Sequence, residues 1–292
     1  MFIIVGILLV FGAVLGGFLM EKGPIIVLMQ PSEFLIIGGA AIGTLLAANP
    51  LHVLKRIAGS IGKVLKGSKY SRARYVDVLR MMFQLFNKAR KAGLVGIESD
   101  VEDPAKSPVF SKCPDFLANH HACDFVCDTM RTAITGGASP YDVDQMMELD
   151  MDVHHAAAML PANSLVTVAD SLPGLGIVAA VLGVVVTMSA LGGPPEEIGH
   201  KVAAALVGTF LGILLCYGMV GPLAANLTKV VDEEHSYYEV MRVVILCFLK
   251  GMSPSLAVEA GRRAVPEHVR PTFKEVEQAC RQKDSASEPA AA

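Results

Sequence analysis

The stretch SLPGLGIVAAVLGVVVTMSALGGPP, residues 171–195, decides the fold class. It contains no Asp, Glu, Lys or Arg, and a helix needs about 20 mostly apolar residues to cross a bilayer. Three other uncharged runs of suitable length occur at residues 2–20, 34–54 and 202–228. The sequence therefore predicts four membrane-spanning helices.

The composition supports a membrane protein. Hydrophobic residues make up 52% of the 292 residues and charged residues only 18%, whereas soluble domains carry about 25% charged residues. These values exclude a disordered chain, and the net charge of −3 gives no general attraction to nucleic acid. Six cysteines in a chain of this length do not indicate a disulfide scaffold. The run at residues 2–20 lacks a basic leader and a cleavage site, so we expect a retained span.

The basic residues indicate the orientation of the spans. Residues 51–90 contain a single acid, Asp77, and ten basic residues: Lys55, Arg56, Lys63, Lys66, Lys69, Arg72, Arg74, Arg80, Lys88 and Arg90. Because basic segments stay on the cytoplasmic side, this segment and both termini are expected there. The predicted organisation is two spans with a short periplasmic loop (1–54), a cytoplasmic domain (55–168), two spans (169–228), and a cytoplasmic helix with a disordered tail (229–292).

The cytoplasmic part is predicted to be helical. Apolar residues recur at helical spacing over 76–89, and Gly93 follows as a C-terminal stop signal. A second helix is expected over 116–134, and a third begins at Ser139-Pro140 and continues into the third span. No alternating strand pattern occurs. The predicted fold class is all-α, with four spans and a helical cytoplasmic domain inserted between spans two and three.

The four uncharged runs contain no Asp, Glu, Lys or Arg, and their one histidine, His52, lies at the edge of its run. Proton relays in membranes are normally built from such groups or from histidines. We therefore expect that the chain either conducts nothing or works with a partner helix that supplies the ionisable group. Glycine pairs spaced four apart, at 12/16, 39/43 and 208/212, would let a helix approach closely, either within the chain or from a partner.

Catalytic and metal-binding motifs are weak. His120, His121, Cys123 and Cys127 lie close together, but a structural zinc site usually takes two separated pairs of ligands, so helix packing is favoured. The sequence has no phosphate-binding glycine loop, nucleophile elbow or metalloprotease helix. We therefore expect neither an enzyme nor a bound cofactor or metal.

Several long motifs, in order along the chain, resemble one family. Residues 161–165 (PANSL) and 170–181 (DSLPGLGIVAAV) resemble the third-span entry of the MotA flagellar motor stator subunits. Residues 207–218 (VGTFLGILLCYG) resemble the fourth span of that family, and 30–33 (QPSE) and 258–263 (VEAGRR) match as well. The resemblance covers essentially the whole chain.

The resemblance implies a function and a set of partners. Subunits of this family form a homo-oligomer, expected to be a pentamer, around the transmembrane helices of two MotB chains in the bacterial inner membrane. MotB carries the proton-binding aspartate and the peptidoglycan anchor, and the cytoplasmic domain engages the rotor switch protein FliG. Proton flow then turns the ring against MotB. Such a partner would supply the carboxylate that the uncharged runs lack.

The resemblance also assigns residues to the ion path. Pro173 and Pro222 match functional prolines near the ion site, and Ala180, Thr209 and Tyr217 match positions that line the path. Sodium-driven relatives usually carry threonine where this chain has Ala180. Alanine at this position resembles the proton-driven branch.

Two charged residues match the pair that the family uses against the rotor. These are Arg90 and Glu98, in the context KARKAG to ESD. The sequence departs from the enteric pattern over residues 151–160, where that version is more acidic and this chain has His154 and His155. A role of that helix in rotor contact is therefore not expected to carry over.

Two other functions are alternatives. An energiser of outer-membrane transport, resembling ExbB or TolQ, would have three spans with the large domain between the first and second, which fits less well. A membrane scaffold without ion flux is the second alternative. Proton leak on co-expression with a partner would separate a conductor from a scaffold.

Overall fold

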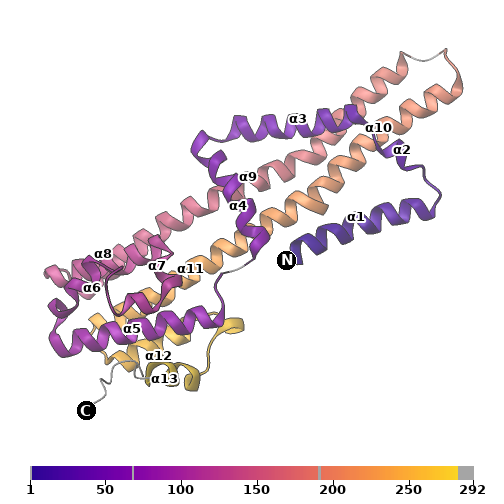
Figure 1. Ribbon diagram of the computed structural model, residues 1–292. Helices are drawn as coiled ribbons and strands as arrows, with labels where there is room; N and C mark the ends of the chain where they lie inside the picture. The colour runs from indigo at the N-terminus through magenta and orange to yellow at the C-terminus, as the bar shows by residue number, and fades with distance from the viewer. Residues whose placement is uncertain (1, 68, 190–191, 282–292) are drawn as a thin grey trace. The chain divides into compact units, whose positions relative to one another are not determined.

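The computed structural model describes residues 2–67, 69–189 and 192–281 (Figure 1). Within these ranges the regular elements are all helical and no strand occurs. Four helical stretches are long and apolar enough to cross a membrane: Phe2–Met20, Ile25–Ala48, Pro140–Met188 and Pro195–Leu249. The predicted all-α class with four candidate membrane spans is therefore confirmed.

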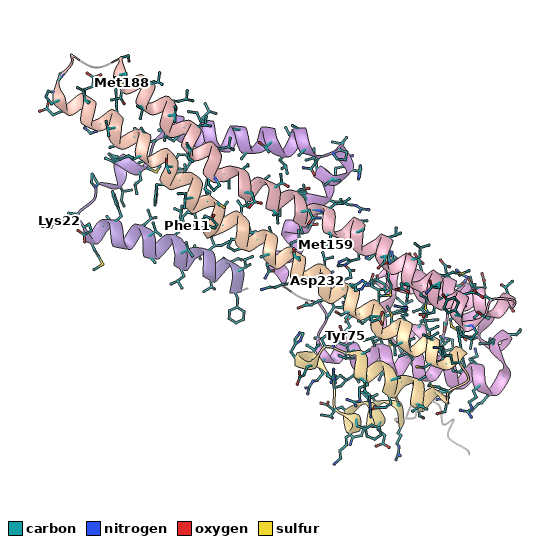
Figure 2. All side chains as sticks on the ribbon, turned by 180° about the vertical axis from the view of Figure 1, so that it is seen from behind. Phe11, Lys22, Tyr75, Met159, Met188 and Asp232 are labelled. Carbon is teal, nitrogen blue, oxygen red and sulfur yellow. The ribbon has the colours of Figure 1, made fainter. Side chains whose placement is uncertain are left out.

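The chain divides into two compact units, and the first consists of residues 1–67 and 157–231. It contains α1 (Phe2–Met20), α2 (Ile25–Leu28), α3 (Pro31–Ala48), α4 (Leu51–Lys66), the later part of α9 (Pro140–Met188), α10 (Pro195–Leu215), the π-helical turn η3 (Cys216–Val220) and the start of α11 (Gly221–Leu249). Apolar side chains cover its outside, as the sticks along α1 around Phe11 show (Figure 2). Leu8 on α1 is 67% exposed. Such a surface is suited to lipid rather than water.

Small residues bring α9 and α10 into backbone contact. A Cβ on Gly176 would lie 2.8 Å from the carbonyl oxygen of Gly208, and one on Gly212 would lie 2.5 Å from that of Leu172. The pair Gly208/Gly212 therefore packs within the chain. At Gly12/Gly16 and Gly39/Gly43, by contrast, no described atom lies within 4 Å of the added Cβ. Those two pairs leave room for another helix or lipid.

The 161–165 motif joins α9 to the end of α3 and the start of α4. Proline has no N–H, so Pro161 leaves the carbonyl of Ala157 without its usual helical donor. Arg56 Nη1 donates to that oxygen at 3.2 Å. Ser164 Oγ lies 2.5 Å from Oδ1 of Asn49, the residue that follows α3. Arg56 thus supplies the hydrogen bond that the Ala157 carbonyl lacks, and the bond between Ser164 and Asn49 holds α9 to the end of α3.

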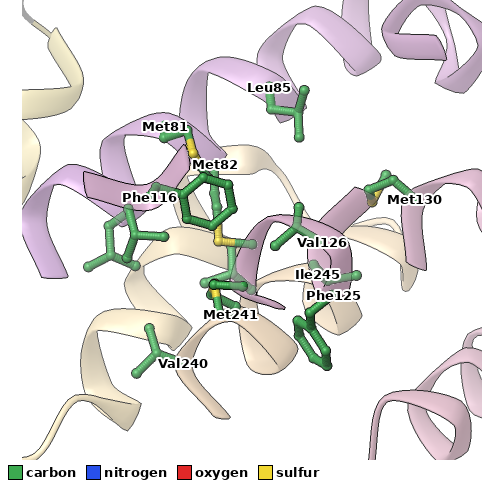
Figure 3. Packing of buried hydrophobic residues seen from close by; sticks show 14 of the residues in the cluster. Met81, Met82, Leu85, Phe116, Phe125, Val126, Met130, Val240, Met241 and Ile245 are labelled. Atoms are coloured by element: carbon green, nitrogen blue, oxygen red, sulfur yellow. The ribbon is translucent and has the colours of Figure 1, made fainter. Parts of the chain in front are cut away.

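The second compact unit consists of residues 68–156 and 232–292. It holds the start of α9, the end of α11, and α5 (Arg72–Ala92), η1 (Leu94–Ile97), α6 (Glu98–Glu102), η2 (Phe110–Lys112), α7 (Pro114–Leu117), α8 (His120–Thr135), α12 (Pro254–Ala264), η4 (Glu267–Val269) and α13 (Phe273–Arg281). Its apolar core is rich in methionine, with Met82, Met130 and Met241 fully buried beside Val126 (Figure 3). This unit can exclude water from its own interior.

Most predicted helix boundaries in this unit are confirmed. α5 ends at Ala92, and Gly93 takes a φ of +77°, which glycine adopts without strain. α9 begins at Pro140 and is continuous to Met188. The predicted helix 116–134 begins later than expected, because Asn119 accepts a hydrogen bond from the N–H of Ala122 and starts α8 at residue 120.

The predicted domain boundaries follow charge, whereas the compact units follow contacts between residues. Both α9 and α11 contribute to the two units, so contacts divide the chain within these helices. The boundaries at 54, 168 and 228 stay a prediction about where the membrane begins and ends. The predicted tail after residue 281 lies outside the described residues.

Candidate ion path and rotor-facing site

Three residues predicted for the ion path gather where α9 and α10 touch. A Cβ on Gly208 would lie 3.3 Å from the amide nitrogen of Ala180, and one on Gly176 would lie 3.3 Å from the Cα of Thr209. Pro173 follows Leu172, whose carbonyl faces Gly212. Ala180 and Thr209 therefore lie in one line of backbone contact between α9 and α10, named here the glycine seam, and Pro173 adjoins the residue at its Gly212 end.

The two other predicted residues lie around η3. Tyr217 is 72% exposed, and Pro222, the second residue of α11, is exposed as well. Pro222 cannot donate to the carbonyl of Gly218, and the helix responds with a π-helical turn in which the N–H of Gly221 donates to Cys216. Both side chains are thus available to a second chain, beside an irregular turn.

The hydroxyl groups of the spans differ in their hydrogen bonds. Thr187 donates to the carbonyl of Gly183 at 2.8 Å, the common bond of a threonine inside a helix. Among the described residues, the Thr209 hydroxyl makes no such bond. Since Thr209 is only half-buried, its hydroxyl is free to meet a ligand or partner at the glycine seam.

A carboxyl group lies at the same place, and the sequence analysis missed it. Glu33 belongs to α3 and is 4% exposed. A Cβ on Gly208 would lie only 2.5 Å from Glu33 Oε2, so the carboxyl occupies the space that a larger residue at 208 would fill. Within the described part of the chain, Oε2 is buried and has no hydrogen-bond partner.

The prediction that the spans contain no carboxylate is therefore wrong. The uncharged run begins at Phe34, but the second candidate span covers Ile25–Ala48 and includes Glu33. The signal was present in the QPSE motif, because proline favours the first position of a helix. With Pro31 in that position, Glu33 falls in the first helical turn and not in the preceding loop.

The predicted rotor-facing residues lie on the surface of the second unit. Arg90 is in the last turn of α5 and Glu98 is the first residue of α6, and both are exposed. In the described ranges neither forms an ion pair within the chain. Both charges are therefore free for an external partner.

An ion pair with a buried carboxylate holds the segment that carries Glu98. Asp100 is 2% exposed and accepts hydrogen bonds from Lys88 Nζ at 2.6 Å and Ser107 Oγ at 2.7 Å. Ser107 Oγ in turn accepts from the N–H of Val109 at 3.1 Å. Since Lys88 belongs to α5, this network fixes residues 98–109 to the helix that carries Arg90. Sequence reasoning missed this role of Asp100.

In the structure, His121 of the histidine–cysteine cluster packs against His154 of α9. The rings of His121 and His154 lie 3.7 Å apart, and both are 5.3 Å from that of Tyr238. Burial and the nearby His154 lower the pKa of His121 below its usual value. Among residues 2–67, 69–189 and 192–281, no group of three or more His, Cys, Asp or Glu could hold a metal ion. The two histidine rings pack at a tilted angle against each other, and His121 meets the ring of Tyr238 edge-on.

The chain is similar to known proteins over almost its whole length. Residues 4–93 match the family described as motility protein A N-terminal, and residues 118–240 match the MotA/TolQ/ExbB proton channel family. Motility protein A of Escherichia coli is 39% identical over 278 residues, covering 95% of this chain and 94% of that protein. Chemotaxis protein LafT of Vibrio parahaemolyticus is 34% identical over 272 residues, covering 93% and 95%.

Two solved structures share the fold. The structure of C. jejuni MotAB has a TM-score of 0.76 at 18% identity and covers 93% of this chain and 98% of its own. The flagellar MotAB stator complex from Bacillus subtilis has a TM-score of 0.70 at 24% identity and covers 88% and 92%. At these identities the likeness concerns the fold.

Proposed function

Since the chain belongs to the motility protein A family and is a flagellar motor stator subunit, we propose that it forms a pentameric ring around two MotB chains and conducts protons with them. The observation that carries this proposal is the glycine seam, which includes Ala180 and the free Thr209 hydroxyl and has Pro173 next to its Leu172 end. A close backbone contact with one free hydroxyl offers a partner helix a polar site in an apolar surface. The exposed apolar sides of the spans supply area for neighbouring subunits and lipid.

The proposed topology places the complex in the bacterial inner membrane. The ten basic residues of 51–90 favour the cytoplasm for that segment and for both termini. The helical domain between the second and third spans would then face the rotor. This orientation places the links before α3 and before α10 on the periplasmic side.

Coupling to rotation would use the partner's aspartate. Protonation removes its charge and with it the preference for Thr209 and Pro173 of one subunit, so the ring can advance to the next. A proton crossing the membrane releases about 2.3 kcal/mol per 100 mV, and each pH unit of gradient adds about 1.4 kcal/mol. Each contact broken per step must therefore cost no more than a few kcal/mol. Breaking a buried ion pair, at about 3–5 kcal/mol, would stall the ring.

Arg90 and Glu98 would transmit the force to FliG. Exposed ion pairs contribute only about 0–1 kcal/mol each. Contacts of that strength can form and release at every step. The buried Asp100 pair keeps the two exposed charges in a fixed arrangement while this happens.

Proton flux tests the proposal. The chain and MotB would be reconstituted in liposomes, and the same variants would be scored for swimming at equal membrane levels. We expect Thr209→Ala and Pro173→Ala to lose most flux and motility. Thr187→Ala is the matched control, because that hydroxyl is occupied by its own helix. Normal swimming of both the Thr209 and Pro173 variants would remove the seam from the mechanism, and a wild-type complex without flux would indicate a scaffold.

A further inference from the structure

Glu33 is the one buried charged residue in the described part of the first unit. Its carboxyl enters between α9 and α10 from α3 and lies against Gly208, next to Thr209 in the chain. No side chain separates it from the backbone contact, because residue 208 has none. The Glu33 carboxyl therefore lies beside residues that are proposed for the ion path.

We propose that Glu33 is a proton-exchanging group that this subunit itself contributes to the ion path; the proposal rests on the proposed function. In this role the chain is not only a scaffold for the carboxylate of its partner. It holds one proton of its own beside the seam and passes it on.

The burial of the group favours its neutral form at rest. An unpaired carboxylate removed from water is costly, whereas the protonated carboxyl buries much less charge. Glu33 Oε2 has no cation or hydrogen-bond donor in contact with it in the described ranges. A group without a fixed partner has no bond to break before it exchanges its proton.

The exchange balances without a further reactant. The O–H bond of the Glu33 carboxyl breaks, and the proton goes to a carboxylate on the partner helix or to a water beside it. A hydronium ion from the outer side then restores the proton on Glu33 and leaves water. One proton enters and one leaves per cycle, and the carboxyl is unchanged.

Replacement by an amide separates proton exchange from packing. Glu33→Gln keeps the size and a hydrogen-bond donor at the same place, but an amide neither releases nor takes up a proton as an acid or base near neutral pH. We would measure proton flux of the reconstituted chain–MotB complex together with co-purification of MotB and the thermal unfolding midpoint. The matched control is Glu21→Gln, an exposed carboxyl directly after α1. Glu33→Asp retains an exchangeable proton on a shorter side chain.

We expect Glu33→Gln to assemble normally and to lose flux by about 100-fold or more, the lower range for loss of a proton-transferring side chain. Glu33→Asp should recover part of the flux, and Glu21→Gln should match the wild type. Wild-type flux in an assembled Glu33→Gln complex would overturn the inference and leave the proposed function intact. If Glu33→Gln fails to assemble and Glu33→Asp assembles without flux, the carboxyl has a packing role only, which also overturns it. Absence of flux in the wild-type complex would instead overturn the proposed function.

Discussion

Removing the charge of Asp100 should release the segment that carries Glu98, the residue proposed to contact the rotor. The carboxylate is buried and accepts two short hydrogen bonds, from Lys88 and Ser107. Hydrogen bonds to a charged group contribute about 1.5–3 kcal/mol each. Asp100→Asn keeps the size of the side chain and one hydrogen bond between neutral groups. Because Lys88 is 41% exposed, its hydrogen bond to Asp100 contributes at the lower end of the range of about 1.5–3 kcal/mol. We therefore expect local opening of residues 94–112 to become easier by roughly 2–3 kcal/mol.

Hydrogen–deuterium exchange on the purified chain–MotB complex measures this opening directly. A change of that size lowers amide protection over residues 94–112 by roughly 30- to 150-fold, since every 1.4 kcal/mol is a factor of ten. Swimming should also fall, because Glu98 would no longer keep its position relative to Arg90. Protection of the first unit should stay unchanged, since the network lies entirely in the second.

A neighbouring ion pair provides the control. Asp103 accepts from Lys106 Nζ at the same distance of 2.6 Å, but this pair is exposed. Asp103→Asn should therefore leave protection and swimming as in the wild type. If the Asp100 and Asp103 variants gave equal exchange rates, burial would not be the source of the stabilisation, and the reasoning would be refuted.

Two further predictions concern the seam and the histidine cluster. Gly208→Ala should displace Glu33 and Ala179, lower the free energy of unfolding by an overpacking cost of about 1–3 kcal/mol, and reduce flux. Gly39→Ala, whose added methyl would meet no described atom within 4 Å, should be tolerated in the same assays. Because burial lowers the pKa of His121, the unfolded chain binds more protons, and the free energy of unfolding should fall as the pH drops below about 6.5, by at most about 1.4 kcal/mol per pH unit. His121→Phe should flatten this part of the pH dependence in thermal unfolding between pH 5 and 8.

The fold could be predicted from the sequence because its signals are local. A span is recognised by the length of an uncharged run, and a helix end by the residue at its cap. Gly93 and Ser139-Pro140 identify their boundaries within a few residues of sequence. The start of α8 was misplaced because 114–117 forms a separate turn before Asn119, and the apolar pattern continues across that break.

The burial of charges could not be predicted in the same way. Lys88, Asp100 and Ser107 come from different elements, and nothing in their spacing indicates that one of the carboxylates of this segment is fully buried while Asp103 is not. Arg56 and Ala157 are 101 positions apart, yet the guanidinium supplies the donor that Pro161 removes. Such pairs depend on which helices pack together.

Gly208 links two features that the sequence presents separately. Its missing side chain allows α9 to approach α10, and it also leaves the space that the carboxyl of Glu33 occupies. Gly208 on α10 and Glu33 of the QPSE motif on α3 therefore belong to one site. An added methyl at 208 would meet the Glu33 oxygen before any other atom, at 2.5 Å against 3.1 Å for Ala179. The Glu33 oxygen is the end of a flexible side chain and can move, whereas Ala179 Cβ at 3.1 Å and the Ala180 nitrogen at 3.3 Å lie on the packed helix, so the requirement for glycine comes from helix packing as well as from the carboxyl. Gly208→Ala combined with Glu33→Ala should therefore recover only part of the stability, and no proton flux.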